Sequence, residues 1–319
     1  MSLRIVMMGT GPFAAPAFRA LYNTPHEVVL LVTRPRRKAS GGRALPDSPL
    51  RAIAAEHDTP TFDPENINTP EAIAELTRYD ADLFIVADYG QILADDVLDA
   101  ARLGGINIHG SLLPKYRGAA PINWAIYHGD RETGVAVIQM TRGLDAGPLL
   151  AQQSVAIAPN DTAATLEPRL ADLGAQLTTD VVDALAAGRA EATPQDMSRV
   201  TRAPRLKKSD GAIDWGRTAE QISNQIRAFD PWPKAFTNWL RTDGPPVRLI
   251  IGSVEVLAAP DSAPPGTVVE AADDRLVIAT GEGVARLSEI QPSGKRMMPA
   301  SEFLRGYRVN VGDHFGPAG

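Results

Sequence analysis

The sequence predicts an α/β protein with a doubly wound, mostly parallel sheet and a second, smaller β domain. Up to residue 190, short runs of apolar and β-branched residues alternate with helix-like segments. The apolar runs lack a clean in-out alternation, which is typical of parallel strands buried on both faces. Beyond residue 210, closely spaced strand-like segments with Pro and Gly turns indicate a small antiparallel barrel or sandwich. A length of 319 residues fits about two domains.

The first part of the chain contains the strands and crossover helices that this fold class requires. Apolar runs bounded by Gly, Asp or a basic loop predict strands at 3–8, 28–32, 83–87, 106–108 and 135–138. Helices are predicted between them at 14–22, 49–57 and 70–79. Leucines and a valine then recur every three or four residues from Leu166 to Leu185, which predicts a long helix closed by Gly188. Pro168 conflicts with its beginning, so we expect the helix to start or kink there.

The second part of the chain begins after a polar, basic and Pro-containing stretch. We expect residues 1–190 to form a catalytic domain, 191–210 a basic linker and 211–319 the smaller β domain. A helix is predicted at 218–228. Strands are predicted at 235–240, 247–256, 266–269, 276–279 and 284–290.

Composition and charge exclude several classes of protein. An apolar content of 44% is too high for a disordered chain, and the longest aliphatic runs are far too short to span a bilayer. The absence of cysteine excludes disulfides, thiolate metal sites and a cysteine nucleophile, and it fits a reducing cytosol. The net charge of −6 does not attract polyanions, but two local stretches, 34–43 and 199–208, are rich in Arg and Lys.

A glycine-rich turn follows the first predicted strand. Residues 9–14 are Gly-Thr-Gly-Pro-Phe-Ala, which matches the dinucleotide-binding pattern G-x-G-x-x-A. Pro12 has no N–H to offer a pyrophosphate, and Arg34 follows the second strand where a ribose-binding carboxylate is expected. Two interpretations remain open: an NADP-binding oxidoreductase that uses Arg34, or a plain strand-to-helix turn.

Candidate catalytic side chains gather at the ends of two predicted strands. Asn107 and His109 are two residues apart, so they project from the same face of a strand that Gly110 ends. An amide donor beside an imidazole suits a reaction in which a carbonyl becomes an oxyanion. Asp145 follows another strand in a glycine-flanked loop. Placed near His109, this carboxylate would fix the imidazole tautomer and raise its basicity.

These residues and their surroundings resemble the 10-formyltetrahydrofolate-dependent formyltransferases. The resemblance includes Ser-Leu-Leu-Pro at 111–114 and Asp-Ala-Gly-Pro at 145–148. It continues through 205–215, 226–233, 290–297 and 303–306, so it covers essentially the full chain. The joint presence and order of the motifs are specific, whereas no single motif would be.

The resemblance implies a Rossmann-like catalytic domain, a linker and a C-terminal barrel of OB type. It also implies an enzyme that transfers the formyl group of 10-formyltetrahydrofolate to the α-amino group of initiator methionyl-tRNA in translation initiation. The implied catalytic residues are Asn107, His109 and Asp145. The implied folate-binding residues are Ser111, Leu112, Leu113 and Pro114, together with Gln91, Ile92 and Leu93. No metal is expected, because these donors can polarise a formamide carbonyl alone.

The basic stretches are the expected tRNA contacts. The loop after the second strand corresponds to a tRNA-engaging insertion of the family, and the later stretch adds two lysines. The expected contacts are Arg34, Arg36, Arg37, Lys38, Arg43, Lys207 and Lys208. Gly41 stands where relatives carry an arginine between two glycines, so Arg43 or Arg37 is expected to replace it. The opening turn also departs from the family pattern G-T-P-x-F-A, because its proline is shifted by one position.

Other functions remain open at this point. A sugar-nucleotide N-formyltransferase or a 10-formyltetrahydrofolate hydrolase would keep the same three catalytic residues, although neither explains both basic stretches. A pure RNA-binding module would leave those three residues unexplained. We expect a cytoplasmic enzyme with no membrane contact and no obligate protein partner.

Overall fold

The computed structural model describes residues 1–36, 47–241, 244–258 and 263–317. The chain divides into two compact units that do not follow the sequence in one cut. The first unit comprises 1–121, 132–156 and 166–204. The second comprises 122–131, 157–165 and 205–319, so two short stretches that lie between segments of the first unit belong to it.

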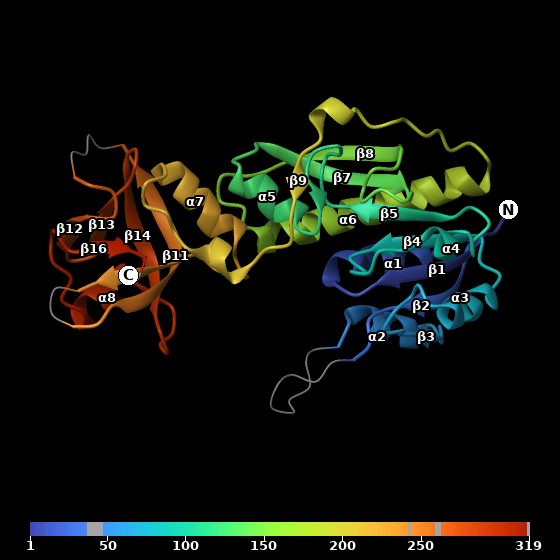
Figure 1. Ribbon diagram of the computed structural model, residues 1–319, viewed down its shortest axis with the longest axis horizontal. Helices are drawn as coiled ribbons and strands as arrows, with labels where there is room; N and C mark the ends of the chain where they lie inside the picture. The colour runs from blue at the N-terminus through green and yellow to red at the C-terminus, as the bar shows by residue number, and fades with distance from the viewer. Residues whose placement is uncertain (37–46, 242–243, 259–262, 318–319) are drawn as a thin grey trace. The chain divides into compact units, whose positions relative to one another are not determined.

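The first unit is built on a seven-stranded sheet in the order β3-β2-β1-β4-β5-β7-β8 (Figure 1). The strands are β1 (Arg4–Gly9), β2 (Glu27–Val32), β3 (Thr61–Phe62), β4 (Leu83–Ala87), β5 (Gly105–His109), β7 (Glu132–Gln139) and β8 (Leu149–Ala156). The first five strands in this order are parallel, whereas β7 runs antiparallel to β5 and β8 antiparallel to β7. The doubly wound, mostly parallel sheet predicted from the sequence is therefore confirmed. The polar edge strand β8 was not predicted, because none of its residues is buried and the apolar signal is weak.

Local sequence signals explain where the helices begin and end. The helices are α1 (Ala15–Leu21), α2 (Pro49–Glu56), α3 (Pro70–Thr77), α4 (Asp95–Leu98), α5 (Pro121–Tyr127) and α6 (Ala163–Ala186). Both α2 and α3 begin with a hydroxyl cap, Ser48 or Thr69, followed by proline in the first helical turn. Helix α6 begins at Ala163, ahead of Pro168, and therefore contains this proline instead of starting at it. Gly188, with a φ of +65°, follows its end as predicted.

The segment from residue 193 to 203 is hydrogen-bonded along the first unit. Thr193 and Leu149 exchange two backbone hydrogen bonds of 2.8 Å. Further on, β9 (Arg202–Ala203) pairs in parallel with β6 (Arg117–Gly118). Gly118 allows this close approach, because a Cβ at its position would lie 2.3 Å from the Ala203 carbonyl oxygen. Much of the expected linker is therefore part of the framework of the first unit.

The second unit contains an antiparallel sheet in the order β12-β13-β14-β11-β10-β16, with β15 paired to β14. Its elements are α7 (Ala219–Ala228), β10 (Phe236–Leu240), β11 (Val247–Leu257), β12 (Val268–Ala272), β13 (Arg275–Ala279), β14 (Val284–Pro292), β15 (Met298–Pro299), α8 (Ala300–Gly306) and β16 (His314–Gly316). The sheet curls into a barrel, because Thr267 bridges to His314 and Val268 N–H donates to the Asp313 carbonyl at 2.8 Å. Of the two predicted β architectures, the barrel is therefore the one observed.

Two earlier stretches pack within the second unit. Asn123 Nδ2 donates to the Ala228 carbonyl at 2.7 Å, and the ring of Tyr127 stacks on Phe229 at 5.3 Å between centroids. Arg227 donates to the Asp161 carbonyl at 2.6 Å. These contacts bury the C-terminal end of α7 against chain that precedes it by more than sixty residues.

Candidate active site

The candidate site begins at the carboxyl end of β5, the last parallel strand of the sheet, between β4 and antiparallel β7. Asn107 lies between Val86 of β4 and Ile138 of β7, and His109 follows it on the same face of the strand. His109 is buried, with 5% of its surface exposed. This is the edge at which open α/β sheets bind their ligands.

Asp145 approaches both side chains from the loop between β7 and β8. Its Oδ1 accepts a hydrogen bond from Asn107 Nδ2 at 3.3 Å, and its Oδ2 accepts one from the Gly118 N–H at 2.8 Å. The same Oδ2 lies 3.7 Å from His109 Nδ1. The fold therefore brings together three side chains that the sequence analysis had grouped. The backbone of Asp145 lies in the left-handed region at a φ of +49°, which is uncommon for a residue with a side chain.

The hydrogen on His109 is placed by a backbone carbonyl. His109 Nε2 lies 2.9 Å from the carbonyl oxygen of Tyr116. Because a carbonyl can only accept, Nε2 carries the hydrogen of the neutral ring, and Nδ1 faces Asp145 with its lone pair. Tyr116 therefore fixes the tautomer that we had expected Asp145 to fix.

A buried arginine and a glutamine support the Asp145 loop. Gln195 Nε2 donates to the carbonyl oxygens of Asp145 at 2.9 Å and of Gly147 at 2.7 Å. Its Oε1 accepts from Arg117 Nε at 3.1 Å and from Arg117 Nη2 at 2.7 Å. Burial is the main cause that lowers the pKa of the Arg117 guanidinium; Arg202 lowers it further and Asp145 opposes the change.

Sequence reasoning missed Gln195, Arg117 and the Tyr116 carbonyl. Gln195 is separated from Asp145 by 50 residues and lies in a polar stretch that looked like a linker. No local spacing or motif marks such a residue, because its role is visible only through contacts made across the fold.

The residues of the Ser-Leu-Leu-Pro motif lie directly after His109. The Ser111 hydroxyl is buried and donates to the Lys115 carbonyl at 2.7 Å. Leu112 is half-buried, and Leu113 and Pro114 are buried. The Leu113 carbonyl accepts from Gln152 Nε2 at 3.0 Å. The structure thus makes this motif a rigid turn beside the catalytic candidates.

The loop after β4 contains the other expected folate contacts. The Gln91 side chain is used internally: its Oε1 accepts from the Ile67 N–H at 3.0 Å, and its Nε2 donates to the Pro64 carbonyl at 3.2 Å. Leu93 is buried in the core. Ile92, by contrast, is 74% exposed.

The expected tRNA contacts are only partly visible. Arg34 Nε donates to the Tyr89 carbonyl at 2.9 Å, and its guanidinium occupies the space that a Cβ on Gly90 would need. Arg36 forms an exposed ion pair with Asp47 at 2.8 Å. Lys207 and Lys208 are exposed in the second unit. The remaining three expected contacts lie outside the described residues: Arg37, Lys38 and Arg43.

The glycine-rich turn after β1 does not favour the binding of a dinucleotide. The Asp88 carboxylate occupies the space next to Gly11 where a Cβ would otherwise fit. It places a negative charge where the pattern would require a pyrophosphate. Arg34, the proposed NADP contact, is hydrogen-bonded to the Tyr89 carbonyl instead. The turn therefore serves the packing of β1 on β4.

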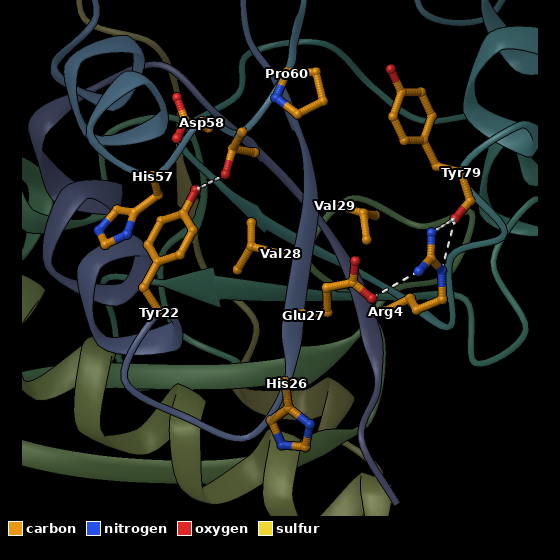
Figure 2. A pocket seen from close by; sticks show the side chains of 11 residues that line it. Arg4, Tyr22, His26, Glu27, Val28, Val29, His57, Asp58, Pro60 and Tyr79 are labelled. Carbon is orange, nitrogen blue, oxygen red and sulfur yellow. Dashed lines mark hydrogen bonds and ion pairs between the residues drawn. The ribbon is translucent and has the colours of Figure 1, made fainter.

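A separate cleft of about 580 Å³ lies at the opposite, amino-terminal ends of β1 and β2 (Figure 2). Figure 2 shows Arg4 hydrogen-bonded to Glu27 and to the Tyr79 carbonyl. The two donor–acceptor distances are 2.8 Å and 3.0 Å. The Tyr22 ring stacks on His57 with 3.8 Å between centroids, and its hydroxyl is 2.6 Å from Thr59 Oγ1. These contacts use the polar groups of Arg4, Glu27, Tyr22 and Thr59 within the fold, and we assign no ligand to this cleft.

Two absences can be stated for the described part of the chain. It contains no group of three or more His, Cys, Asp or Glu side chains placed to hold a metal ion. None of its helices combines the length and apolar character that crossing a bilayer requires.

Comparison with known proteins gives full-length relatives. The formyl transferase family model matches residues 3–182, and the model of the formyl transferase C-terminal domain matches 205–308. The methionyl-tRNA formyltransferase of Geobacter sulfurreducens is 40% identical over 99% of this chain and 98% of its own. That of Desulfotalea psychrophila is 43% identical over 97% of this chain and 94% of its own.

Solved structures share the fold at low identity. The N-formyltransferase of Helicobacter canadensis, in complex with folinic acid and dTDP-3-aminofucose, has a TM-score of 0.65 and 18% identity over 90% of this chain and 98% of its own. HypX of Aquifex aeolicus, in complex with tetrahydrofolic acid, has a TM-score of 0.62 and 17% identity over 98% of this chain and 48% of its own. The family models and the relatives together show that this chain belongs to the formyl transferase family and is a formyl-transferring enzyme.

Proposed function

We propose that this enzyme transfers the formyl group of 10-formyltetrahydrofolate to the α-amino group of initiator methionyl-tRNA. The observation that carries the proposal is the convergence of Asn107, His109 and Asp145 at one strand end, in a chain about 40% identical over its full length to methionyl-tRNA formyltransferases. The alignments to these enzymes cover nearly the whole chain, including both regions that match the family models. We place the reaction in the cytoplasm, where translation begins.

Asn107 is proposed as the donor to the developing oxyanion. One hydrogen of its Nδ2 is directed to Asp145 Oδ1 at 3.3 Å, which orients the amide and leaves the second hydrogen for the substrate oxygen. A single donor of this kind contributes roughly 10²–10³ in rate in other acyl-transfer enzymes. Asp145 therefore acts here by orienting Asn107.

His109 is proposed as the group that holds a proton during transfer. Its Nε2 hydrogen is engaged by the Tyr116 carbonyl, so Nδ1 is the atom that accepts a proton from the attacking amine. The resulting imidazolium lies 3.7 Å from Asp145 Oδ2, which stabilises its positive charge. The same charge favours the neighbouring oxyanion. As the bond between the formyl carbon and N10 of the donor breaks, the proton passes from His109 to that nitrogen, and tetrahydrofolate leaves.

The residues around the site fit a folate as formyl donor. When bound, this donor supplies a formyl group on nitrogen, whose carbonyl needs hydrogen-bond donors but no metal. Exposed apolar side chains, Ile92 and Leu144 at 74% and 53%, lie in the loops that follow β4 and β7. They would pack against a flat pterin ring, as apolar pocket walls do in other ligand sites. We assign the donor contacts to these loops and to the turn at 111–114.

The acceptor is tested by competition. The chain is given 10-formyltetrahydrofolate together with charged initiator tRNA, free methionine and an aminosugar nucleotide. We expect formyl transfer to the charged tRNA alone. Transfer to the sugar nucleotide would contradict the acceptor assignment, and donor cleavage without any formylated product would indicate a hydrolase. Tight NADPH binding without folate binding would instead favour an oxidoreductase.

The roles at the site are tested by three substitutions. Asn107→Ala, His109→Ala and Asp145→Ala should each lower kcat by ~10² or more while thermal unfolding remains cooperative. Gln153→Glu, an exposed change on β8, serves as the control and should leave kcat unchanged. A trio variant with near-normal turnover would remove that residue from the mechanism.

A further inference from the structure

We propose that Gln195 is a positioning residue for the Asp145 loop. The stretch expected to be a linker, 191–210, therefore contributes a residue that holds the active site in place. This inference rests on the proposed function, because it concerns how Asp145 reaches Asn107 and His109. Gln195 itself touches neither of these two side chains in the described contacts; it acts through the loop backbone.

The first argument is the geometry of the amide. The two hydrogens of Gln195 Nε2 are directed to the carbonyl oxygens of Asp145 and Gly147, at 2.9 Å and 2.7 Å. The amide is therefore hydrogen-bonded to the loop backbone on both sides of Ala146. Asp145 needs such support, because its left-handed backbone, with a φ of +49°, is strained for a residue with a side chain unless the surroundings hold it.

The second argument is that the orientation of the amide is determined. Arg117 has only donors, and it contacts Gln195 Oε1 through Nε and Nη2 at 3.1 Å and 2.7 Å. Only the NH₂ end of Gln195 can then face the two carbonyls. Arg117 is 4% exposed and Gln195 is half-buried, so the arginine side of this contact is shielded from water.

The third argument is that one side chain joins both segments that shape the site. Arg117 lies between Tyr116, whose carbonyl holds His109, and Gly118, whose N–H holds the Asp145 carboxylate at 2.8 Å. Gln195 connects this strand to the Asp145 loop. Displacing the loop by about 1 Å is enough to cost ~10² in rate in other enzymes.

The chain on either side anchors Gln195. Thr193 pairs with Leu149 at the start of β8, two residues before Gln195. On the other side, Thr201 Oγ1 accepts from the Tyr116 N–H at 2.8 Å, and its carbonyl accepts from the Arg117 N–H at 3.0 Å. Backbone hydrogen bonds on both sides therefore hold the segment that carries Gln195, as a positioning role requires.

The test compares Gln195→Glu with the unmodified full-length chain. A carboxylate keeps its acceptors for Arg117 but has no hydrogen for the Asp145 and Gly147 carbonyls, and it repels them. We expect kcat for methionyl-tRNA formylation to fall by ~10–100-fold, with KM for donor and tRNA within about two-fold. Gln195→Met, which is uncharged and of similar length, should lower kcat by the same order. If the Glu variant does not fold, the kcat of the Met variant is the test. Gln153→Glu is the matched control, since it introduces the same change on exposed β8.

A double-variant cycle separates positioning from a general structural effect. In an Asp145→Ala background, Gln195→Glu should cause no further loss in a single-turnover assay, because the carboxylate it positions is already gone. A full additional 10–100-fold loss there would overturn the inference, as would normal kcat in folded Gln195→Glu. Failure of the proposed function is distinguishable, since the unmodified chain would then fail to formylate methionyl-tRNA at all.

Discussion

Glu167 illustrates how single carboxylates respond to their surroundings in this protein. It lies in α6, is half-buried, and has a raised pKa chiefly because burial disfavours its charge; the Asp88 carboxylate raises it further. Because the folded-state pKa lies above the unfolded value, the folded chain binds the proton more tightly. The stability that this proton supports is present at acid pH and is lost as the pH rises through the folded-state pKa.

Replacing Glu167 with glutamine should therefore stabilise the protein at neutral pH. We expect Glu167→Gln to raise the free energy of unfolding at pH 7 by up to ~1 kcal/mol, a modest value because solvent screens a half-exposed group. The difference from the unmodified chain should shrink as the pH falls toward 4. Thermal unfolding at several pH values measures it, with the exposed Glu191→Gln as control. A variant that is less stable at pH 7 would contradict this account.

At the scale of elements, the short pairing of β6 with β9 matters more than its length suggests. It presents the Gly118 N–H to Asp145 and ends the segment that carries Gln195. Gly118 has a φ of +133°, and the Ala203 carbonyl fills the place of a Cβ. A two-residue strand thus depends on one glycine for both its conformation and its close approach.

Gly118→Ala should damage stability and activity together. We expect a loss of ~1–3 kcal/mol in the free energy of unfolding, from strain and from displacing β9. We also expect a fall in kcat of at least ~10-fold, because the donor to Asp145 moves. Chemical denaturation and steady-state kinetics give the two quantities.

Gly188→Ala is the matched control, because Gly188 also has a positive φ, +65°, yet nothing lies within 4 Å of a Cβ there. It should cost ~1 kcal/mol and leave kcat unchanged. Equal kcat in the two variants would show that the β6–β9 pairing does not affect the site.

At the scale of the whole molecule, the net charge is negative, but basic residues are concentrated in two short stretches. The chain carries a net charge of −6, so any attraction to tRNA must come from local basic stretches. Of the basic loop after β2, Arg34 is tied to the Tyr89 carbonyl and Arg36 to Asp47. Arg34 therefore supports local structure as well as charge, and a test of tRNA binding should treat it separately.

The salt dependence of tRNA binding tests the basic loop. If its side chains contact phosphates, the logarithm of tRNA affinity should fall linearly with the logarithm of salt concentration. Neutralising Arg36, Arg37, Lys38 and Arg43 together should flatten that slope and raise KM for tRNA, while donor binding stays nearly unchanged. Adding Arg34→Ala to this set measures its separate contribution. An unaltered slope in the four-fold variant would mean that the loop is not a phosphate contact.

The sequence by itself determined the strands β1, β2, β4, β5 and β7, most of the helices, and the shared face of Asn107 and His109. These features follow from local rules: apolar runs mark buried strands, and residues two apart on a strand point the same way. The resemblance of its motifs to a known family, confirmed by the full-length relatives, supplied the grouping with Asp145.

Only the tertiary structure decided how that group is assembled. The Asn107–Asp145 bond spans 38 residues, the Gln195–Asp145 bond spans 50, and the hydrogen on His109 is placed by a backbone carbonyl that no side-chain pattern could reveal. The closure of the barrel likewise depends on Thr267 meeting His314 at the far end of the chain. Local sequence records which residues are buried and in what conformation. Contacts between distant segments are decided by packing, and a polar stretch such as 191–204 shows its role only when its partners are in place.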